Sequence, residues 1–555
     1  MILKGSKSKK SHRLGAGIVI CILLLIIAFA YIVSVGQSHT IRLDFTASSL
    51  SPKQRTADFK YISSAIKKFL PEYDEYEKLY KFDYSEKETL YIKKLENCTG
   101  DFEFFCILNG YFNDIPSIHT NIVFPDKNKY SSYGCYNKDS FLRTTYNLNE
   151  AADYWYDCIE KDSEKFFDAN IYCFNYSNNN YSINDVASSD CDMKRITFIN
   201  GTDPVDYICN LISAYKLKYD HINKTPYREG IIFNDSFGEK IIVEGVDLNG
   251  KSVTKEFYYS LETETAHILK GYFEQNTQNK NEEEKLVELD YSLDEIDTEY
   301  FYIYKDYDNS VVYAEILGFD NCYGINLKSA LEKCLGFENI IIDIRYNSGG
   351  YIQYFSNYIY PFISDKSIVY ENRAMFKKNE FTKEMLDLSK YSLTYNVVKK
   401  ENKTYCLSEI YEFTGGKDIF ENVYILIGSN TASAADFAAS FVKENSIGAL
   451  IGTNTAGEGR TGSFLMNKLP QSGLLFTYNF CEYENSDGKD NSVYGTAPDI
   501  YSTISDENIE LMENIKLCDG KAYTYENRLK WDDVLIETLE LIKEDENDKG
   551  NNAVN

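Results

Sequence analysis

The stretch that most constrains the fold lies between residues 422 and 462 and predicts a strand, a turn and a helix in succession. Residues 423–427 form a short apolar run, which is typical of a buried strand. A turn cluster follows at residues 428–431, and residues 432–436 open a helix whose apolar positions recur at helical spacing. Ser433 is therefore expected where a strand breaks into a helix, between small neighbours that leave its hydroxyl uncovered.

This position of Ser433 suits a serine nucleophile. The first N–H groups of a helix have no intrahelical acceptor, and such donors can hold the oxyanion of a tetrahedral intermediate. A serine that caps the helix in an ordinary α/β turn is the alternative, because serine is a preferred N-cap residue. This stretch alone leaves both interpretations open.

A second stretch, residues 339–350 (NIIIDIRYNSGG), predicts a strand that runs into a polar turn ending in Gly349 and Gly350. Glycines can bring backbone N–H groups close to a ligand. Together with TASAAD at 431–436, IGTNTAGEG at 451–459 and YGTAPDI at 494–500, this stretch resembles the S41 family of serine peptidases. That family includes the tail-specific proteases, the tricorn core and the chlamydial secreted protease, and the resemblance covers residues 296–505.

The resemblance implies an α/β core of the crotonase/ClpP-like type with Ser433 as nucleophile. It also implies an oxyanion hole made by Gly349, Gly350 and the backbone N–H of Ala434, protein or peptide substrates, and no cofactor. Alternation of strands and helices from residue 300 onward independently favours an α/β core. A non-catalytic relative that keeps the fold as a peptide or small-ligand binding module is the alternative from another class.

The base that takes the serine proton is the next question, because a serine is inert without one. Tail-specific proteases use a lysine in the glycine-rich turn after the nucleophile helix, and here that position carries Glu458. Another branch uses an upstream histidine after a helix, and His119 resembles it, although more residues than usual separate it from Asp114. His221 and His267 lie in no motif.

The histidine-type enzymes add an acid, which would hold the imidazole and stabilise the imidazolium. The matching segment is residues 476–484, in which Glu482 is our choice. Glu484 and Glu458 are its rivals, and a surface carboxylate on an edge strand is the structural alternative.

The N-terminus predicts a membrane anchor. Residues 1–14 carry several lysines and an arginine, and residues 15–36 are almost wholly apolar and long enough to cross a bilayer. Positive flanking charge keeps the tail cytoplasmic, so the body is expected to be extracytoplasmic, at the cell surface or in the secretory pathway. A long signal peptide cut after Gly36 is the alternative. The net charge of −27 argues against nucleic acid as a partner.

Cysteine usage agrees with export. Cys21 lies in the apolar stretch and the other twelve of the thirteen cysteines follow it, an even number that predicts disulfides. Their spacing suggests no metal site. Glycosylation sequons stand at Asn97, Asn175, Asn180, Asn200, Asn223, Asn234 and Asn402.

The length of 555 residues predicts two or three domains. A helical, cysteine-rich region is expected at residues 37–194, with residues 130–181 largely irregular and disulfide-tied around one helix. A degenerate PDZ-like module is expected at residues 195–273, with a hairpin at Asn249 and Gly250. A charged linker (274–295), the catalytic core (296–545) and a disordered tail (546–555) complete the chain.

Overall fold

The computed structural model describes residues 43–553, except for short gaps at 82, 127–129, 131–133, 138–139, 178, 187–190, 248, 279–289, 291, 321–322, 390–394, 401–403, 418, 460–463, 484 and 520–522. The predicted tail and anchor, residues 1–36, fall outside this range. Within it, no helix combines the length and apolar character needed to cross a membrane.

The centre of the molecule is a seven-stranded sheet in the order β14-β15-β16-β17-β21-β22-β25. Its strands from β16 to β25 run parallel, while β14 and β15 form an antiparallel edge. The strands span Glu295–Asp297, Phe301–Asp306, Val311–Ile316, Asn339–Asp343, Asn422–Ile427, Ala449–Gly452 and Ile500–Tyr501. This arrangement confirms the predicted α/β core.

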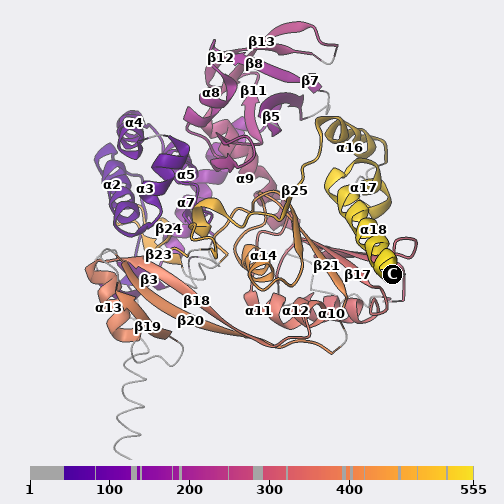
Figure 1. The fold of residues 1–555 in the computed structure, drawn as a ribbon. Coiled ribbons are helices and arrows are strands. Elements are labelled where there is room, and N and C mark those ends of the chain that lie inside the picture. Colours follow the sequence, from indigo (N-terminus) through magenta and orange to yellow (C-terminus); the bar gives the residue numbers. More distant parts are fainter. Residues whose placement is uncertain are drawn as a thin grey trace, which may run out of the picture.

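Helices cover both faces of this sheet (Figure 1). Ile340 and Ile342 of β17 pack in the layer that contains α10 (Gly324–Glu332) and α14 (Ala434–Glu444). Ile341 packs in the opposite layer, against α18 (Asp533–Ala553). A strand that is buried on both faces has an unbroken apolar sequence. For this reason the apolar runs of β17 and β21 predicted these strands correctly.

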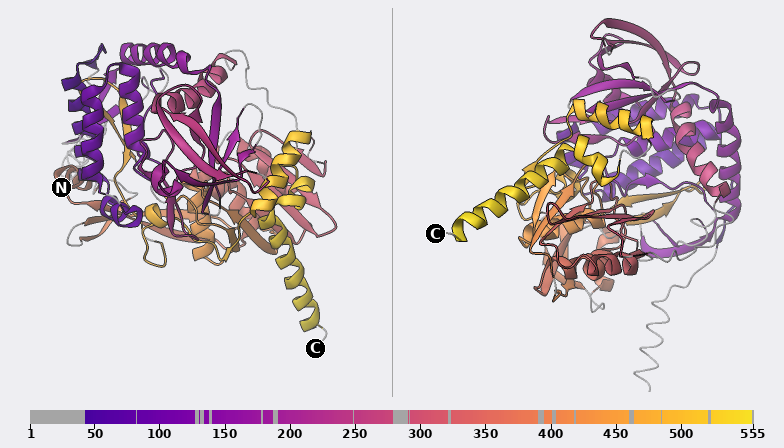
Figure 2. Two further views of the ribbon diagram at one scale, coloured as in Figure 1. Left: turned by 90° about the horizontal axis from the view of Figure 1, so that it is seen from above. Right: turned by 90° about the vertical axis from the view of Figure 1, so that its right-hand side faces the viewer.

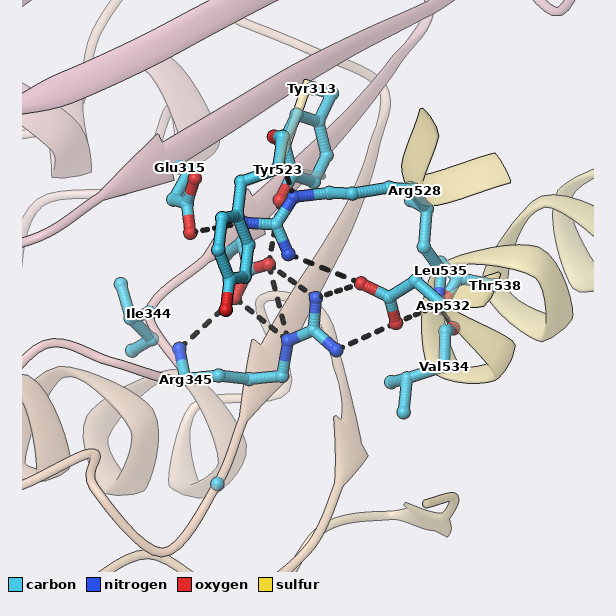
Figure 3. Close-up of polar contacts among 12 residues, drawn as sticks. Tyr313, Glu315, Ile344, Arg345, Tyr523, Arg528, Asp532, Val534, Leu535 and Thr538 are labelled. Atoms are coloured by element: carbon cyan, nitrogen blue, oxygen red, sulfur yellow. Dashed lines mark hydrogen bonds and ion pairs between the residues drawn. The ribbon is translucent and has the colours of Figure 1, made fainter. Parts of the chain in front are cut away.

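A buried ion network joins the C-terminal helices to the end of β17 (Figure 3). The Arg345 guanidinium donates to Asp532 Oδ1 at 2.8 Å and to Asp532 Oδ2 at 2.5 Å, and it also contacts both oxygens of Asp343. Arg528, on α17 (Tyr525–Trp531), donates to Asp532 at 3.3 Å and to Glu315 at 2.6 Å. Asp532 therefore pairs with two buried cations, one from the segment after β17 and one from α17.

A six-stranded sheet combines segments that lie far apart in the sequence, in the order β1-β4-β3-β23-β24-β2. Its strands span Leu43–Asp44, Ser140–Asn147, Gly134–Asn137, Phe464–Lys468, Leu475–Asn479 and Asn121–Ile122. The N-terminal region is helical, as predicted, and its helices pack beside this sheet: α2 (Pro52–Phe69), α3 (Tyr73–Tyr80), α4 (Tyr84–Asn97), α5 (Asp101–Asn113) and α7 (Asn149–Ser163). The stretch 130–181 is thus built of strands around one helix and is less irregular than predicted.

A second seven-stranded sheet, in the order β7-β6-β5-β11-β13-β12-β8, projects from the body (Figures 1 and 2). Its hairpin of β12 (Glu239–Val246) and β13 (Ser252–Tyr259) confirms the predicted turn. The sheet begins before residue 195, because β5 (Ile171–Ser177), β6 (Asn180–Asp185) and β7 (Cys191–Met193) belong to it with β8 (Arg195–Ile199) and β11 (Ile231–Asn234). Its helices are α8 (Pro204–Asn210) and α9 (Leu261–Gln278), which extends into the predicted linker.

The remaining elements connect these layers. They are β9 (Lys218–Asp220), β10 (Thr225–Tyr227), α11 (Ile352–Tyr354), α12 (Tyr360–Ile363), β18 (Ile368–Lys377), α13 (Glu380–Ser389), β19 (Tyr395–Lys400), β20 (Thr404–Phe413), α15 (Asn491–Tyr494) and α16 (Asp506–Asp519). Helix α18 runs to Ala553, so most of the predicted tail is helical and extends from the body (Figure 2).

The structure corrects two expectations about modification. The sequence predicted that disulfides tie the region around α7, but Cys158 and Cys173 are free thiols. The cysteines at 98, 106, 209 and 334 are also free thiols. The sequon at Asn234 is fully buried, and its side-chain amide donates to the carbonyls of Phe237 and Tyr258. A glycan at Asn234 is incompatible with this packing.

Candidate active site

Ser433 is the N-cap residue of α14, after the strand β21, and its backbone is strained. Its φ of 51° and ψ of −126° are uncommon for a residue other than glycine, a conformation that costs on the order of 1–3 kcal/mol. Neighbouring segments hold it there, because Ser433 N–H donates to Gly457 O at 3.1 Å and Ala432 N–H donates to Asn347 O at 3.0 Å. Strain that the surroundings maintain is typical of functional turns.

The three residues predicted for the oxyanion hole lie around this turn, but they are not equivalent. Gly349 N–H donates to Asn347 Oδ1 at 2.9 Å and is therefore occupied. Within the described part of the chain, the N–H groups of Gly350 and Ala434 meet no acceptor. A Cβ on Gly349 would lie 2.7 Å from Ser433 Cβ, so Gly349 allows the close approach, and the other two residues offer the donors.

Sheet pairing brings His119 to the cavity that Ser433 lines. It lies between α5 and β2, and β2 pairs with β24 of the six-stranded sheet through Asn121 opposite Thr477 and Ile122 opposite Phe476. The imidazole stacks on the ring of Phe464, with centroids 5.7 Å apart. Ser433 and His119 consequently line one cavity of about 860 Å³, which Gly350 and Phe464 also line.

The carboxylate that the structure shows beside His119 belongs to Glu458. Its oxygens accept the backbone N–H of Ile118 at 3.2 Å and of His119 at 3.0 Å, and Oε2 lies 3.8 Å from His119 Nε2. Glu458 is only 1% exposed, and it adopts a positive φ of 58° in the loop that follows β22. A buried carboxylate in this place can orient the imidazole and stabilise a positive charge on it.

Glu482, the acid chosen from the sequence, belongs to a cluster of carboxyl groups that also includes Glu72, Glu458 and Asp490. Its backbone bridges to Met375, and its side chain hydrogen-bonds Asp490. Burial, and then the carboxylate of Glu482, raise the pKa of Asp490 well above its usual range. Burial, and then Asp490, Glu458 and Glu482, do the same to the pKa of Glu72. The site thus has several closely spaced carboxyl groups behind Glu458.

Replacing Glu72 with glutamine is expected to stabilise the protein at neutral and alkaline pH. Because the folded-state pKa of Glu72 is raised, its stabilising contribution is complete below the unfolded value of about 4.5 and is lost as pH rises through the folded value. Glutamine stays neutral and keeps an oxygen for Asn479 Nδ2, which donates to Glu72 at 2.8 Å. The gain is about 1.4 kcal/mol for each unit by which the pKa is raised.

Urea unfolding at pH 5 and pH 8 measures this effect. Glu75→Gln, in the first turn of the helix α3 that Glu72 caps, is the control, because its side chain is 43% exposed. The gain should appear at pH 8 and be smaller at pH 5. A Glu72→Gln protein whose stability changes by the same amount at both pH values would contradict the expected electrostatic origin.

Two further residues of the cavity have no local sequence signal. Lys216 and His221 line it beside Ser433, although neither lies in a motif. Burial lowers the pKa of His221 to about 4, so this imidazole is neutral at physiological pH. His267 lies on α9 and is not among the residues that line the cavity. Only the folding of distant segments reveals the positions of Lys216 and His221.

Comparison with known proteins supports the sequence resemblance. Residues 310–502 match the model of Peptidase family S41, whereas no curated protein sequence matches the chain. Mature CPAF shares 12% identity with a TM-score of 0.49, covering 82% of this chain and 94% of its own. A photosystem II D1 C-terminal processing protease shares 10% identity with a TM-score of 0.34, covering 81% and 93%. A tricorn protease shares 11% with a TM-score of 0.33, covering 89% and 37%.

Proposed function

We propose that this chain, whose residues 310–502 match the model of Peptidase family S41, hydrolyses peptide bonds with Ser433 as nucleophile and His119 as general base. The observation that carries the proposal is the shared cavity, which a strained serine at a helix N-terminus, His119 and Gly350 line together. In the described part of the chain the N–H groups of Gly350 and of Ala434, next to the serine, meet no acceptor. A binding module needs neither a strained serine nor unoccupied donors beside it.

In the proposed reaction His119 takes the proton of Ser433 as the hydroxyl oxygen attacks the substrate carbonyl carbon. The N–H groups of Gly350 and Ala434 stabilise the negative charge that develops on the carbonyl oxygen. His119 then returns the proton to the leaving amine, and a water molecule hydrolyses the acyl-enzyme by the same steps. Glu458 is the acid that orients and stabilises the imidazole, and Glu482 is its rival.

Covalent labelling tests the proposal. A fluorophosphonate should modify Ser433 of the wild type, and peptide mapping should find the adduct on no other serine, because only an activated hydroxyl reacts. The full chain should also hydrolyse an unstructured substrate such as casein. If Ser433 stays unlabelled and casein stays intact, the fold serves as a binding module instead.

We also propose that residues 15–36 anchor the protein in a membrane with its body outside the cytoplasm. The lysine-rich residues 1–14 and the length of the apolar stretch support this orientation. Protease added to intact cells should remove a tag placed after Asn555. A tag that is cut only after lysis would reverse the orientation. The crotonase/ClpP-like type of core and the PDZ-like module stay predictions.

A further inference from the structure

The ammonium group of Lys216 is surrounded by backbone carbonyl oxygens of the segment that carries His119. Nζ donates to the carbonyls of Phe112 at 3.1 Å, Ile115 at 3.2 Å, Ser117 at 2.8 Å and Thr120 at 2.9 Å. The first of these belongs to the last turn of α5, where carbonyls have no intrahelical donor. A cation at a helix C-terminus is also electrostatically favourable.

The segment makes few backbone hydrogen bonds of its own beyond the end of α5. Ile115 N–H donates to Phe112 O and Thr120 N–H donates to Ser117 O, both at 3.3 Å. The carbonyls of Ser117 and Thr120, which bracket His119, thus face the same ammonium. Without a cation, four carbonyl dipoles would converge with their negative ends together.

At the His119 end of the segment, Glu458 accepts the N–H groups of Ile118 and His119. The other contacts from the part of the chain that carries Lys216 anchor only the start of the segment. Leu217 N–H donates to Asn113 O at 2.9 Å, Asn113 Nδ2 donates to Ala214 O at 2.8 Å, and Arg228 pairs with Asp114. The hydrogen bonds of Lys216, by contrast, run along the segment from Phe112 to Thr120.

We propose that Lys216 is a positioning residue, whose ammonium fixes the segment 112–120 and thereby holds His119 at the Ser433 cavity. The proposal rests on the proposed peptidase function only for its effect on catalysis. Lys216 lines the same cavity, and burial lowers its pKa to about 7. The positioning role belongs to the protonated form, which donates to the four carbonyls, and a role as the base is the outcome that would overturn the proposal. A displacement of about 1 Å in a catalytic group can cost about 10²-fold in rate.

The test is Lys216→Met in the full chain, which keeps the apolar stem and removes the donors. Amide hydrogen exchange should accelerate in peptides that cover residues 112–124, while exchange in β17 and β21 stays as in the wild type. On casein-derived peptides kcat should fall by about 10²-fold with little change in KM, because ground-state binding does not need the base. Lys251→Met, on the exposed turn before β13, is the matched control.

A conservative variant guards against simple misfolding. Lys216→Arg keeps a cation with several donors, so it should recover exchange protection of residues 112–120 and part of the lost kcat. Unchanged exchange in Lys216→Met would overturn the proposal. If activity vanished with exchange unchanged, Lys216 would be the base itself and the positioning role would be wrong. If the segment loosened but kcat stayed intact, the link to His119 would be refuted.

The exchange measurement also separates this inference from the proposed function. A wild type that hydrolyses no peptide would refute the peptidase proposal, whereas faster exchange in Lys216→Met would still show that the ammonium fixes the segment.

Discussion

Ser433→Ala and His119→Ala are each expected to lower kcat on the order of 10⁶-fold, and the double variant should be no worse than either. The nucleophile and its base act as a unit, so the loss of one makes the other useless. Both residues line the same cavity although more than 300 positions separate them. The loss should appear mainly in kcat, because proton transfer stabilises the transition state more than the bound substrate.

Measurement of kcat and KM on an unstructured peptide substrate checks this result, with His267→Ala on α9 as the control that should retain activity. His221→Ala is the informative comparison, because His221 also lines the cavity. If His221→Ala abolished hydrolysis and His119→Ala did not, the base would be His221.

The same assay decides between the two acids. Glu458→Gln should lower kcat by up to about 10⁴-fold, as loss of the charge behind a catalytic imidazole does elsewhere. Glu458 accepts two N–H groups of the His119 segment, so its removal also loosens that segment. Glu482→Gln should cost less than Glu458→Gln. The reverse order would restore Glu482 as the acid that the sequence motif implies.

Asp532→Ala is expected to lower the free energy of unfolding by about 3–5 kcal/mol, because it leaves two buried guanidinium groups without their shared carboxylate. Asp532 is fully buried, and it accepts hydrogen bonds from both Arg345 and Arg528 (Figure 3). Arg345 continues the β17 strand toward the turn of Gly349 and Gly350. The rate of Ser433 labelling should therefore fall together with stability.

Urea unfolding measures the stability change, and Glu75→Ala provides the contrast. Glu75 forms an ion pair with Lys78 at 2.6 Å, but the Lys78 side chain is 70% exposed and the Glu75 side chain 43%, so solvent screens the pair. Its removal should leave the unfolding free energy nearly unchanged. An Asp532→Ala protein as stable as the wild type would mean that Arg345 and Arg528 find other partners or water.

The sequence by itself determined the features that local patterns encode. The strands β17 and β21 were predicted because residues buried on both faces must all be apolar, and the strand–turn–helix unit around Ser433 follows from turn residues and helical spacing. The hairpin of β12 and β13 follows from its Asn-Gly turn. Each of these signals lies within a few consecutive residues, where backbone preference and burial act directly.

Only the tertiary structure decided which side chains meet at the site. The pairing of β2 with β24 brings residue 119 to the core, and the loop after β22 sets Glu458, not a residue of the predicted acidic segment, against the His119 backbone. Lys216 reaches the same segment from about 100 residues away. These contacts depend on the packing of distant segments, and no local pattern records them, because a single carboxylate or lysine has the same sequence appearance whether it is solvated or buried in a site.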